Sequence, residues 1–240
     1  DSRIWDVRQL NDQNLLLTYD SKNGEEGYPG NLKIQVLYTL MANNSLRIEY
    51  IAITNKETVV NFTNHSYFNL NGAGNGKIYN QVLMINANSY TPIDSTEIPT
   101  GQIVSVKGTP FDFTQPTPIG KRINENNQQL KYANGYDDNW VLNKPKRGSL
   151  TLAARVYDPG NGREIEVYTT QPGLQFYSGN FLNGKTIGKG RKPYKYRTAF
   201  TLETQHFPDS PNHPNFPSTI LKPGQIFHSI TIFHFTTMKQ

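Results

Sequence analysis

The chain has 240 residues, of which 18% are charged and 12% aromatic, and its formal net charge at pH 7 is +5. It contains no cysteine, which excludes disulfides, thiolate metal sites and a cysteine nucleophile. Because no apolar run approaches the roughly 20 residues of a membrane-spanning helix and no signal peptide is visible, we expect a cytoplasmic protein without a membrane partner.

The first third of the chain predicts antiparallel strands. Apolar residues alternate with polar ones from residue 32 to 40, and a period of two indicates a strand with one buried face. The pair Asn43-Asn44 then makes a tight turn, after which the alternation resumes and completes a hairpin. We expect strands at residues 14–20, 32–40, 46–50 and 58–63, the first of them buried and the last running into residues 64–70.

Strand patterns continue through the rest of the chain. Further strands are expected at residues 81–87, 150–156, 165–167, 169–182 and 226–235. Residues 158–162 (DPGNG) are a strong turn signal between two of them. Residues 118–130 predict one short helix, and Asp137 and Asp138 are expected on a turn just before an aromatic strand.

Strands recur at short intervals, and the sequence shows no long helical period, internal repeat or linker. We therefore predict an all-β fold, a large antiparallel β-sandwich that forms a single domain over residues 1–240. On such a sheet, alternate side chains from distant parts of the sequence converge on the concave face, where a ligand binds.

Glu203 is the first candidate for a catalytic group. It lies near the end of a strand in which Phe200 and Leu202 alternate with Thr201, and the loop that follows, residues 206–217, contains four prolines. Each proline fixes its own φ and restricts the residue before it, so the loop is stiff and holds the carboxylate in place. The alternative is a glutamate on a solvated strand face.

His65 is the second candidate. It ends a predicted strand and has polar and aromatic neighbours, which can orient an imidazole by hydrogen bonds. Paired with a fixed Glu203, it would form a general acid–base couple. Taken alone, it has the alternative of a structural histidine.

The other four histidines suggest no chemistry. His206 and His213 lie near Asp209, but their spacing matches no common ligand pattern, so we expect no metal site. His228 and His234 alternate with apolar residues on the last strand and are expected to be structural.

The basic segment Lys185–Arg197, with Tyr194 and Tyr196 between the charges, is a pattern also found in nucleic-acid-binding proteins. Gly188, Gly190 and Pro193 within it, and Gly184 just before it, make it a flexible connection. We therefore favour a solvated loop and expect no nucleic-acid partner.

Four blocks carry a resemblance to a known family. They are Asn64–Leu70 (NHSYFNL), Gly135–Trp140 (GYDDNW), Gln171–Tyr177 (QPGLQFY) and Leu202–Asp209 (LETQHFPD). These blocks resemble the signature sequences of the aldose 1-epimerases, the galactose mutarotases, and they occur in family order. The resemblance implies a galactose mutarotase-like supersandwich, no cofactor, and interconversion of the α and β anomers of free aldohexoses such as galactose and glucose.

The resemblance also assigns roles to residues. The family's glutamate base falls on Glu203 and its histidine acid on His65, while its sugar-binding aspartate and glutamine fall on Asp137 and Gln175. Four aromatic residues of the same blocks would either form an apolar wall for the sugar ring or belong to the core: Tyr67, Phe68, Tyr136 and Trp140.

The chain departs from the family in two ways. Asp138 stands where the family usually has histidine, and its charge is expected to change sugar preference or to raise the pKa of Asp137. The chain also starts just past the family's Asn-x-Leu-His-Gly-Gly block and an upstream arginine. We therefore expect residues 1–240 to be the carboxyl-terminal two-thirds to three-quarters of a longer mutarotase domain, with an open sheet edge.

Two functions are compatible with this truncation. The first is a mutarotase whose fold is completed by a missing amino-terminal segment or a second chain. The alternative is a non-catalytic carbohydrate-binding or regulatory module of the same fold.

Overall fold

The computed structural model describes residues 3–238. The strands are β1 (Asp6–Asn11), β2 (Asn14–Ser21), β3 (Leu32–Met41), β4 (Ser45–Thr54), β5 (Thr58–Val59), β6 (Val82–Ile85), β7 (Ala87–Thr91), β8 (Val104–Ser105), β9 (Thr117–Pro118), β10 (Asp137–Leu142), β11 (Thr151–Tyr157), β12 (Arg163–Thr169), β13 (Gly173–Tyr177), β14 (Thr201–Gln205), β15 (Ile220–Leu221) and β16 (Phe227–Thr237). The α-helix α1 spans Gln128–Tyr132, and short 3₁₀ turns lie at Glu25–Gly27, Ile119–Lys121, Lys189–Arg191 and Ser210–Asn212.

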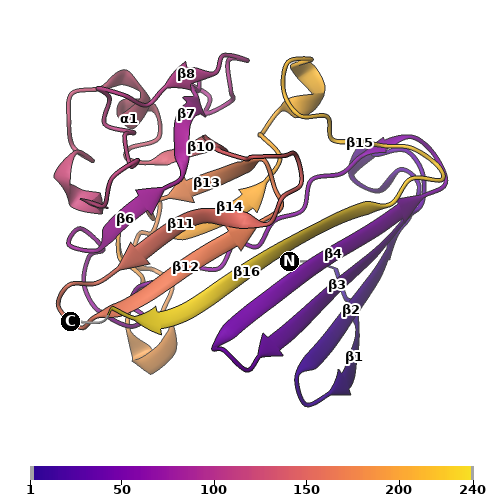
Figure 1. Cartoon of the computed structure of the whole chain (residues 1–240), viewed down its shortest axis with the longest axis horizontal. Coiled ribbons are helices and arrows are strands. Elements are labelled where there is room, and N and C mark those ends of the chain that lie inside the picture. The colour runs from indigo at the N-terminus through magenta and orange to yellow at the C-terminus, as the bar shows by residue number, and fades with distance from the viewer. Residues whose placement is uncertain (1–2, 239–240) are drawn as a thin grey trace.

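Two large sheets, both antiparallel, organise the described residues (Figure 1). The first has nine strands in the order β1-β2-β3-β4-β16-β12-β11-β6-β9, and the second has five in the order β14-β13-β10-β7-β8. Strands β15 and β5 form a small separate pair. The all-β, antiparallel fold expected from the sequence is confirmed.

Aromatic side chains fill the core beneath the second sheet. Tyr136, Trp140 and Phe176 are fully buried and contact Phe111 and Phe113 from the connection between β8 and β9. The Trp140 indole donates to the Phe111 carbonyl at 3.0 Å, and the Tyr136 hydroxyl donates to the Pro110 carbonyl at 3.1 Å. Buried rings with satisfied polar ends contribute strongly to stability, so β10 and β13 are held rigidly from below.

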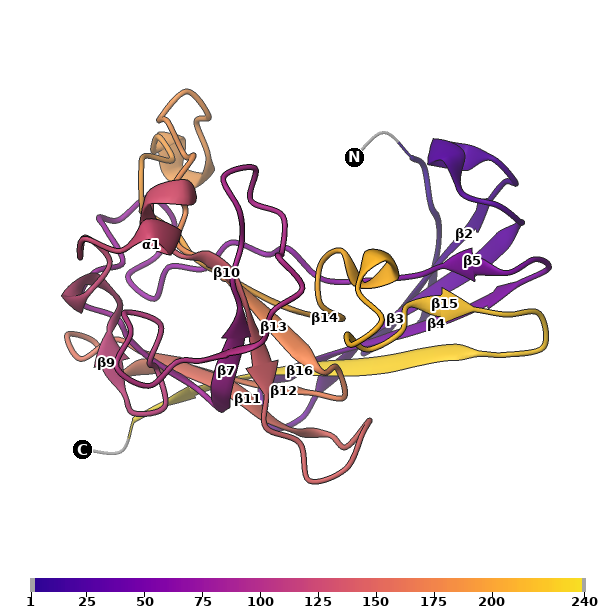
Figure 2. The ribbon, with the colours of Figure 1, turned by 90° about the horizontal axis from the view of Figure 1, so that it is seen from above.

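Strands β1–β4, which we call the arm, extend away from the second sheet (Figure 2). The expected strand at residues 14–20 is present as β2, but the expectation that it is buried is wrong, because none of its residues is fully buried. The reason is position: the second sheet covers the inner strands of the nine-stranded sheet and does not reach β1 and β2. Strand β1, which we did not predict, is exposed along its whole length.

Other elements differ from the expectation in extent. The helix expected within residues 118–130 is a 3₁₀ turn at Ile119–Lys121 followed by α1, which begins at Gln128. Of the strand expected at 58–63, Thr58 and Val59 pair with β15, and the chain continues without regular structure. Asp137 and Asp138 do not lie on a turn before a strand, because they are the first two residues of β10.

The basic segment Lys185–Arg197 is mostly exposed, as expected of a solvated loop, but Arg197 is buried. Its guanidinium donates to the Tyr79 hydroxyl, the Asn124 side chain and the Asn134 carbonyl, so this charge ties loops together. No helix within residues 3–238 combines the length and the apolar character that a membrane crossing requires.

Candidate active site

The face of the second sheet opposite the aromatic core carries the polar residues of the family blocks. Along a strand, alternate side chains point to opposite faces, so Glu203 points outward from β14 while Leu202 is buried in the core. Gln175 on β13 lies directly opposite Glu203, and Tyr177 lies opposite Thr201. Asp137 on β10 is in turn opposite Tyr177. The register alone therefore places three of the four predicted site residues on one face.

The fourth, His65, comes from a segment that runs beside β14 without forming a continuous ladder. The Asn61 side chain exchanges two hydrogen bonds of 3.0 Å with the backbone of His206. At the other end, Phe68 and Phe200 exchange backbone hydrogen bonds of 2.8 and 2.9 Å. These two ties align the segment antiparallel to β14, and His65 falls opposite Glu203.

His65 and Glu203 meet at the centre of the site. The His65 Nε2 lies 3.3 Å from Glu203 Oε1, with the histidine side chain 49% exposed and the glutamate side chain 10% exposed. Glu203 Oε1 also accepts a 2.7 Å hydrogen bond from the Thr201 hydroxyl. The structure thus brings the two candidates together from positions 138 residues apart in the sequence.

A cavity of about 420 Å³ opens above this pair. Its lining includes His65, Glu203, Asp137 and Gln175, so all four residues predicted from the sequence share one hollow. The Gln175 amide nitrogen donates to Asp137 Oδ1 at 2.9 Å, which fixes the orientation of the aspartate. Such a volume is at the lower end of the range for small-molecule sites and suits a monosaccharide.

Burial shifts the carboxyl groups of the cavity toward neutral pH. It raises the pKa of Glu203 above its ordinary value, although the Thr201 hydrogen bond and the nearby His65 lower it in part. Burial also raises the pKa of Asp137 to about 6, against the lowering effect of the Gln175 hydrogen bond, and the neighbouring Glu203 raises it further. Carboxyl groups with raised pKa values in one cavity are a recognised mark of functional sites.

Asp138 does not act on the site as we expected. It is fully buried on the opposite face of β10 from Asp137, and burial raises its pKa to about 8. The pKa of Asp137 is raised first by its own burial, and Asp138 is not among the charges that raise it. At neutral pH Asp138 is therefore mostly protonated and adds little charge, so the expected electrostatic effect on Asp137 is wrong.

The four aromatic residues of the family blocks divide between cavity and core. Tyr67 is 50% exposed and lines the cavity, with its ring 5.0 Å from that of His65. Tyr136 and Trp140 belong to the buried cluster, and Phe68 packs against the core. Alternation along β10 explains why Trp140 is in the core: it lies three residues after Asp137, so its side chain points to the opposite face of the sheet.

The sequence analysis missed several residues of the lining. These are Tyr177, Phe181, Gln205 and Pro208. Two of them could have been predicted. Tyr177 lies two residues after Gln175 and Gln205 two residues after Glu203, so each shares a face of its strand with a predicted site residue. Thr201, the hydrogen-bond donor to the catalytic candidate, was named only as part of the alternation.

The remaining histidines lie outside this cavity. His228 Nε2 lies 2.6 Å from Glu49, and His234 Nδ1 lies 2.9 Å from the Ser45 hydroxyl, in keeping with structural roles. His213 contacts Asp209 at 3.1 Å. Among residues 3–238, no group of three or more potential ligands is arranged to hold a metal ion.

Comparison with known proteins is consistent with this geometry. The family described as Aldose 1-epimerase matches residues 1–234. The galactose mutarotase of Bos taurus is 44% identical over 238 residues, covering 98% of this chain and 66% of the bovine protein. The aldose 1-epimerase of Escherichia coli K12 is 39% identical over 237 residues, covering 98% of this chain and 67% of that protein.

Solved structures show the same fold. The GalM/aldose epimerase homologue from C. elegans matches with a TM-score of 0.88 at 27% identity, covering 99% of this chain and 70% of that one. The galactose 1-epimerase from Lactobacillus acidophilus matches with a TM-score of 0.84 at 29% identity, covering 99% and 68%. The chain thus spans just under two thirds of the bovine relative. The family match over almost the whole sequence shows that the chain belongs to the aldose 1-epimerase family.

Proposed function

We propose that this chain carries the acid–base pair of an aldose 1-epimerase, a cofactor-independent isomerase that interconverts the α and β anomers of free aldohexoses. The observation that carries the proposal is the 3.3 Å approach of His65 to Glu203 inside the cavity that Asp137 and Gln175 also line. The resemblance of the sequence blocks supplies the reaction type.

The proposed chemistry begins with Glu203 ionised and His65 protonated. Glu203 takes the proton of the anomeric hydroxyl while His65 gives a proton to the ring oxygen, and the bond between C1 and the ring oxygen breaks. Rotation about C1–C2 presents the other face of the aldehyde. The two groups then exchange roles, and the ring closes as the opposite anomer.

The geometry suits this reaction because the two oxygen atoms that exchange protons are bonded to the same carbon. Their partners must therefore lie side by side, as His65 and Glu203 do. Both groups also need pKa values near the working pH, and the burial that raises the pKa of Glu203 moves it in that direction.

Asp137 and Gln175 would hold the sugar. The Asp137 carboxylate accepts hydrogen bonds from sugar hydroxyls, and the Gln175 amide keeps it in place. Tyr67 offers an exposed ring at the cavity wall, which suits the apolar face of a pyranose. The names of the relatives support galactose as a substrate, and we propose glucose as a second one.

Glu203→Gln is the direct test of the base. The exchange of α-D-galactose anomers, followed by polarimetry, should fall by roughly 10²–10⁴-fold, while galactose binding measured by titration calorimetry is largely kept. Glu57→Gln changes an exposed glutamate far from the cavity and should leave both unchanged. Full activity in Glu203→Gln would reject the base assignment.

The same measurements separate the enzyme from the non-catalytic alternative. Galactose binding without any anomer exchange, in the unaltered chain and also after the missing third of the fold is supplied, would favour a carbohydrate-binding module. His65→Gln provides the second arm, since removing the acid should lower the exchange rate with little change in binding.

A further inference from the structure

The basic segment Lys185–Arg197 lies at the end of the molecule opposite the arm, as the orange loop in Figure 1 and Figure 2 shows. It carries six basic residues and no acidic one, which is more positive charge than the net +5 of the whole chain. Its backbone is hydrogen-bonded to itself. The Gly184 amide donates to the Tyr194 carbonyl at 2.8 Å, and nearer the tip the Gly188 amide donates to the Lys192 carbonyl at 2.9 Å. The segment is therefore an ordered hairpin that holds its charges in place.

A pocket of about 320 Å³, which we call the lysine pocket, lies between this hairpin and the loop of residues 71–77. Three lysines line it, without any acidic residue: Lys77, Lys192 and Lys195. The two loops are in close contact, because a Cβ atom at Gly74 would come within 2.7 Å of the Lys192 Cβ. The Lys192 ammonium group also donates to the Asn75 side chain. These contacts gather the lysines around one hollow.

The positive charges of the lysine pocket have no counter-ions among residues 3–238. None of the ion pairs within this part of the chain includes Lys77, Lys192 or Lys195. The Lys77 ammonium group instead lies 5.0 Å from the centre of the Tyr79 ring and 5.7 Å from that of the Tyr196 ring, distances that fit cation–π contacts. Like charges held close together repel one another, so the pocket favours a ligand with more than one negative charge.

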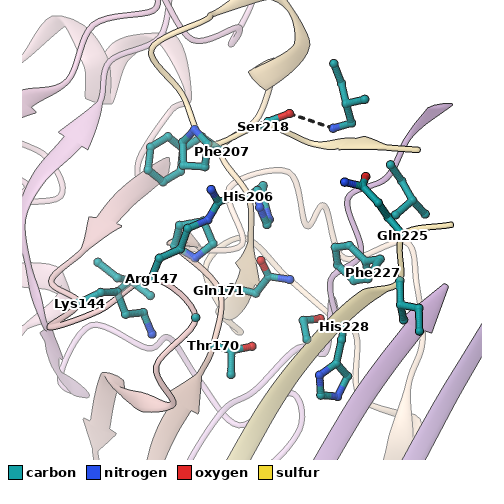
Figure 3. Close-up of a pocket in the computed structure, with 18 of the residues that line it drawn as sticks. Lys144, Arg147, Thr170, Gln171, His206, Phe207, Ser218, Gln225, Phe227 and His228 are labelled. Atoms are coloured by element: carbon teal, nitrogen blue, oxygen red, sulfur yellow. Dashed lines mark hydrogen bonds between the residues drawn. The ribbon is translucent and has the colours of Figure 1, made fainter. Parts of the chain in front are cut away.

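A larger hollow of about 820 Å³ also contains basic residues, Lys144 and Arg147, but is a poorer anion site (Figure 3). The Lys144 ammonium group already donates to three oxygen atoms: the carbonyls of Ser149 and Thr169 and the hydroxyl of Thr151. Burial also lowers the pKa of Lys144 to about 8. The three lysines of the lysine pocket are exposed, and of their ammonium groups only that of Lys192 has a hydrogen-bond partner within residues 3–238.

Tyr196 lines both the lysine pocket and a second pocket of about 320 Å³, which we call the asparagine pocket. Three asparagines line the latter, together with Glu125, Lys131 and the buried Arg197: Asn124, Asn126 and Asn134. Arg197 is 2% exposed, and its Nε has no hydrogen-bond partner among the described residues. An unpaired buried donor costs about 1–3 kcal/mol, and asparagine amides both donate and accept. The asparagine pocket therefore suits hydroxyl groups, whereas the Glu125 carboxylate makes it less suitable than the lysine pocket for an anion.

We propose that the lysine pocket binds the phosphate group of a small phosphate ester, whose hydroxyl-bearing organic part lies in the asparagine pocket. A phosphate monoester carries a charge of about −1.5 to −2 at pH 7 and three acceptor oxygens, which matches three lysine ammonium groups around one hollow. Neither pocket shares a lining residue with the sugar cavity. The inference therefore concerns a second ligand and goes beyond the proposed reaction.

The arrangement favours a small ester over other anions. A carboxylate has a single charge and two oxygen atoms, so it would leave part of the lysine cluster unused. A nucleic acid needs a basic groove that follows successive phosphates, whereas these lysines surround one pocket. The Arg197 guanidinium adjoins the same Tyr196 ring, with its central carbon 4.5 Å from the ring centre, so the second group of charges continues toward the asparagine pocket and away from the hairpin tip.

The test is titration calorimetry of chain 1–240 with three probes: sorbitol 6-phosphate, adenosine 5′-monophosphate and inorganic phosphate. The better of the two esters should bind at least about tenfold more tightly than inorganic phosphate, about 1.4 kcal/mol, because inorganic phosphate leaves the asparagine pocket empty. Tighter binding of sorbitol 6-phosphate would identify a sugar-type phosphate, and tighter binding of adenosine 5′-monophosphate a nucleotide. Added salt should weaken both, because exposed charges are screened.

Matched variants locate the site. The double variant Lys77→Gln, Lys195→Gln removes two exposed charges from the lysine pocket and should weaken ester binding at least about tenfold. Lys107→Gln, Lys121→Gln removes the same charge from exposed lysines that line neither pocket and should leave binding unchanged. Asn126→Ala alters an exposed residue of the asparagine pocket and should weaken the ester while leaving inorganic phosphate unaffected.

Three results would overturn the proposal. Equal weakening in the two double variants would show a general effect of net charge. Esters that bind no more tightly than inorganic phosphate would exclude the asparagine pocket. A single-stranded oligonucleotide that binds more tightly than both esters, through Lys185 and Arg191 outside the two pockets, would assign the hairpin to nucleic acid. Neither ester is a free aldose and no readout is catalytic, so this site and the proposed reaction can fail independently.

Discussion

The Thr201 hydroxyl donates a 2.7 Å hydrogen bond to the same Glu203 oxygen that lies 3.3 Å from His65. Thr201 is buried and lies two residues before Glu203 on the same face of β14. Its hydrogen bond opposes the effect of burial by lowering the pKa of Glu203. In the proposed reaction Thr201 would therefore be a positioning residue, which orients the carboxylate and helps to keep it ionised.

Replacement of Thr201 by valine should move the acidic limb of the kcat/KM profile to higher pH. Valine keeps the shape of the side chain and removes the donor, so burial raises the pKa of Glu203 against the opposing effect of His65 alone. The exchange rate should fall more at mildly acidic pH than at alkaline pH, as measured by polarimetry across a pH series. Thr201→Ser should restore the profile. An equal loss at every pH would show that Thr201 affects packing alone.

Sugar affinity should weaken as the pH falls through about 6. Burial raises the pKa of Asp137 to about 6, so below that pH the group is protonated and loses accepting capacity toward sugar hydroxyls. Hydrogen bonds to charged groups are worth about 1.5–3 kcal/mol, which predicts roughly 10- to 100-fold weaker binding in acid.

Calorimetric titration with galactose over a pH series measures this effect. Glu203, Glu97 and His65 also act on the Asp137 carboxyl electrostatically, so the titration should be repeated in Glu203→Gln to remove one of them. Asp137→Asn should bind weakly at all pH values, without the dependence. A pH dependence that persists in Asp137→Asn would assign it to another group.

The buried Asp138 should make the protein less stable as the pH rises. Burial raises its folded-state pKa to about 8, above the unfolded value of about 3.9. The unfolded chain therefore releases the proton first, and the contribution of Asp138 to the free energy of unfolding falls between about pH 4 and about pH 8.

Asp138→Asn removes this titration while keeping an acceptor for the Asp137 amide. The variant should be more stable than the parent near about pH 8, by about 1–3 kcal/mol, and its stability should fall less across the window. Urea unfolding followed by tryptophan fluorescence reports it. Asp20→Asn, at an exposed position, is the control. A difference between Asp138→Asn and the parent that does not change with pH would contradict the assignment.

The sequence predicted those parts of the fold in which local pattern and burial agree. The alternation of residues 32–40 corresponds to β3, and the alternation of Phe200 and Leu202 with Thr201 and Glu203 corresponds to β14, where Leu202 is in the core. Strand β1 was missed because every residue of it is exposed, so no apolar period marks it. Strands β8 and β9 have two residues each, which is too short for any period.

The members of the candidate site came mainly from family resemblance, and their arrangement could not be read from the sequence. The contact between His65 and Glu203 depends on two ties, one by a side chain and one by backbone, on either side of His65. Neither tie has a sequence pattern. The orientation of Asp138 could have been inferred, because neighbouring residues of a strand point to opposite faces and Asp138 directly follows Asp137. Its protonation could not, because it depends on how deeply the folded protein buries the carboxyl group.

The tie at Asn61 should matter more for turnover than for binding. Asn61 donates to the His206 carbonyl and accepts from the His206 amide, both at 3.0 Å, and so fixes the segment that brings His65 to Glu203. Asn61→Ala frees one end of that segment while leaving Asp137 and Gln175 in place. We expect kcat to fall several-fold with little change in KM, because the acid is less often aligned with the base.

The loss of these hydrogen bonds should also lower the free energy of unfolding by about 1–3 kcal/mol, so stability alone must be excluded as the cause. Asn55→Ala is a matched control: Asn55 accepts a 2.7 Å hydrogen bond from the Asn31 amide, far from the cavity. It should lower stability to a similar degree and leave kcat unchanged. Equal loss of kcat in the two variants would place the effect in general stability, whereas loss in Asn61→Ala alone follows from the alignment of His65.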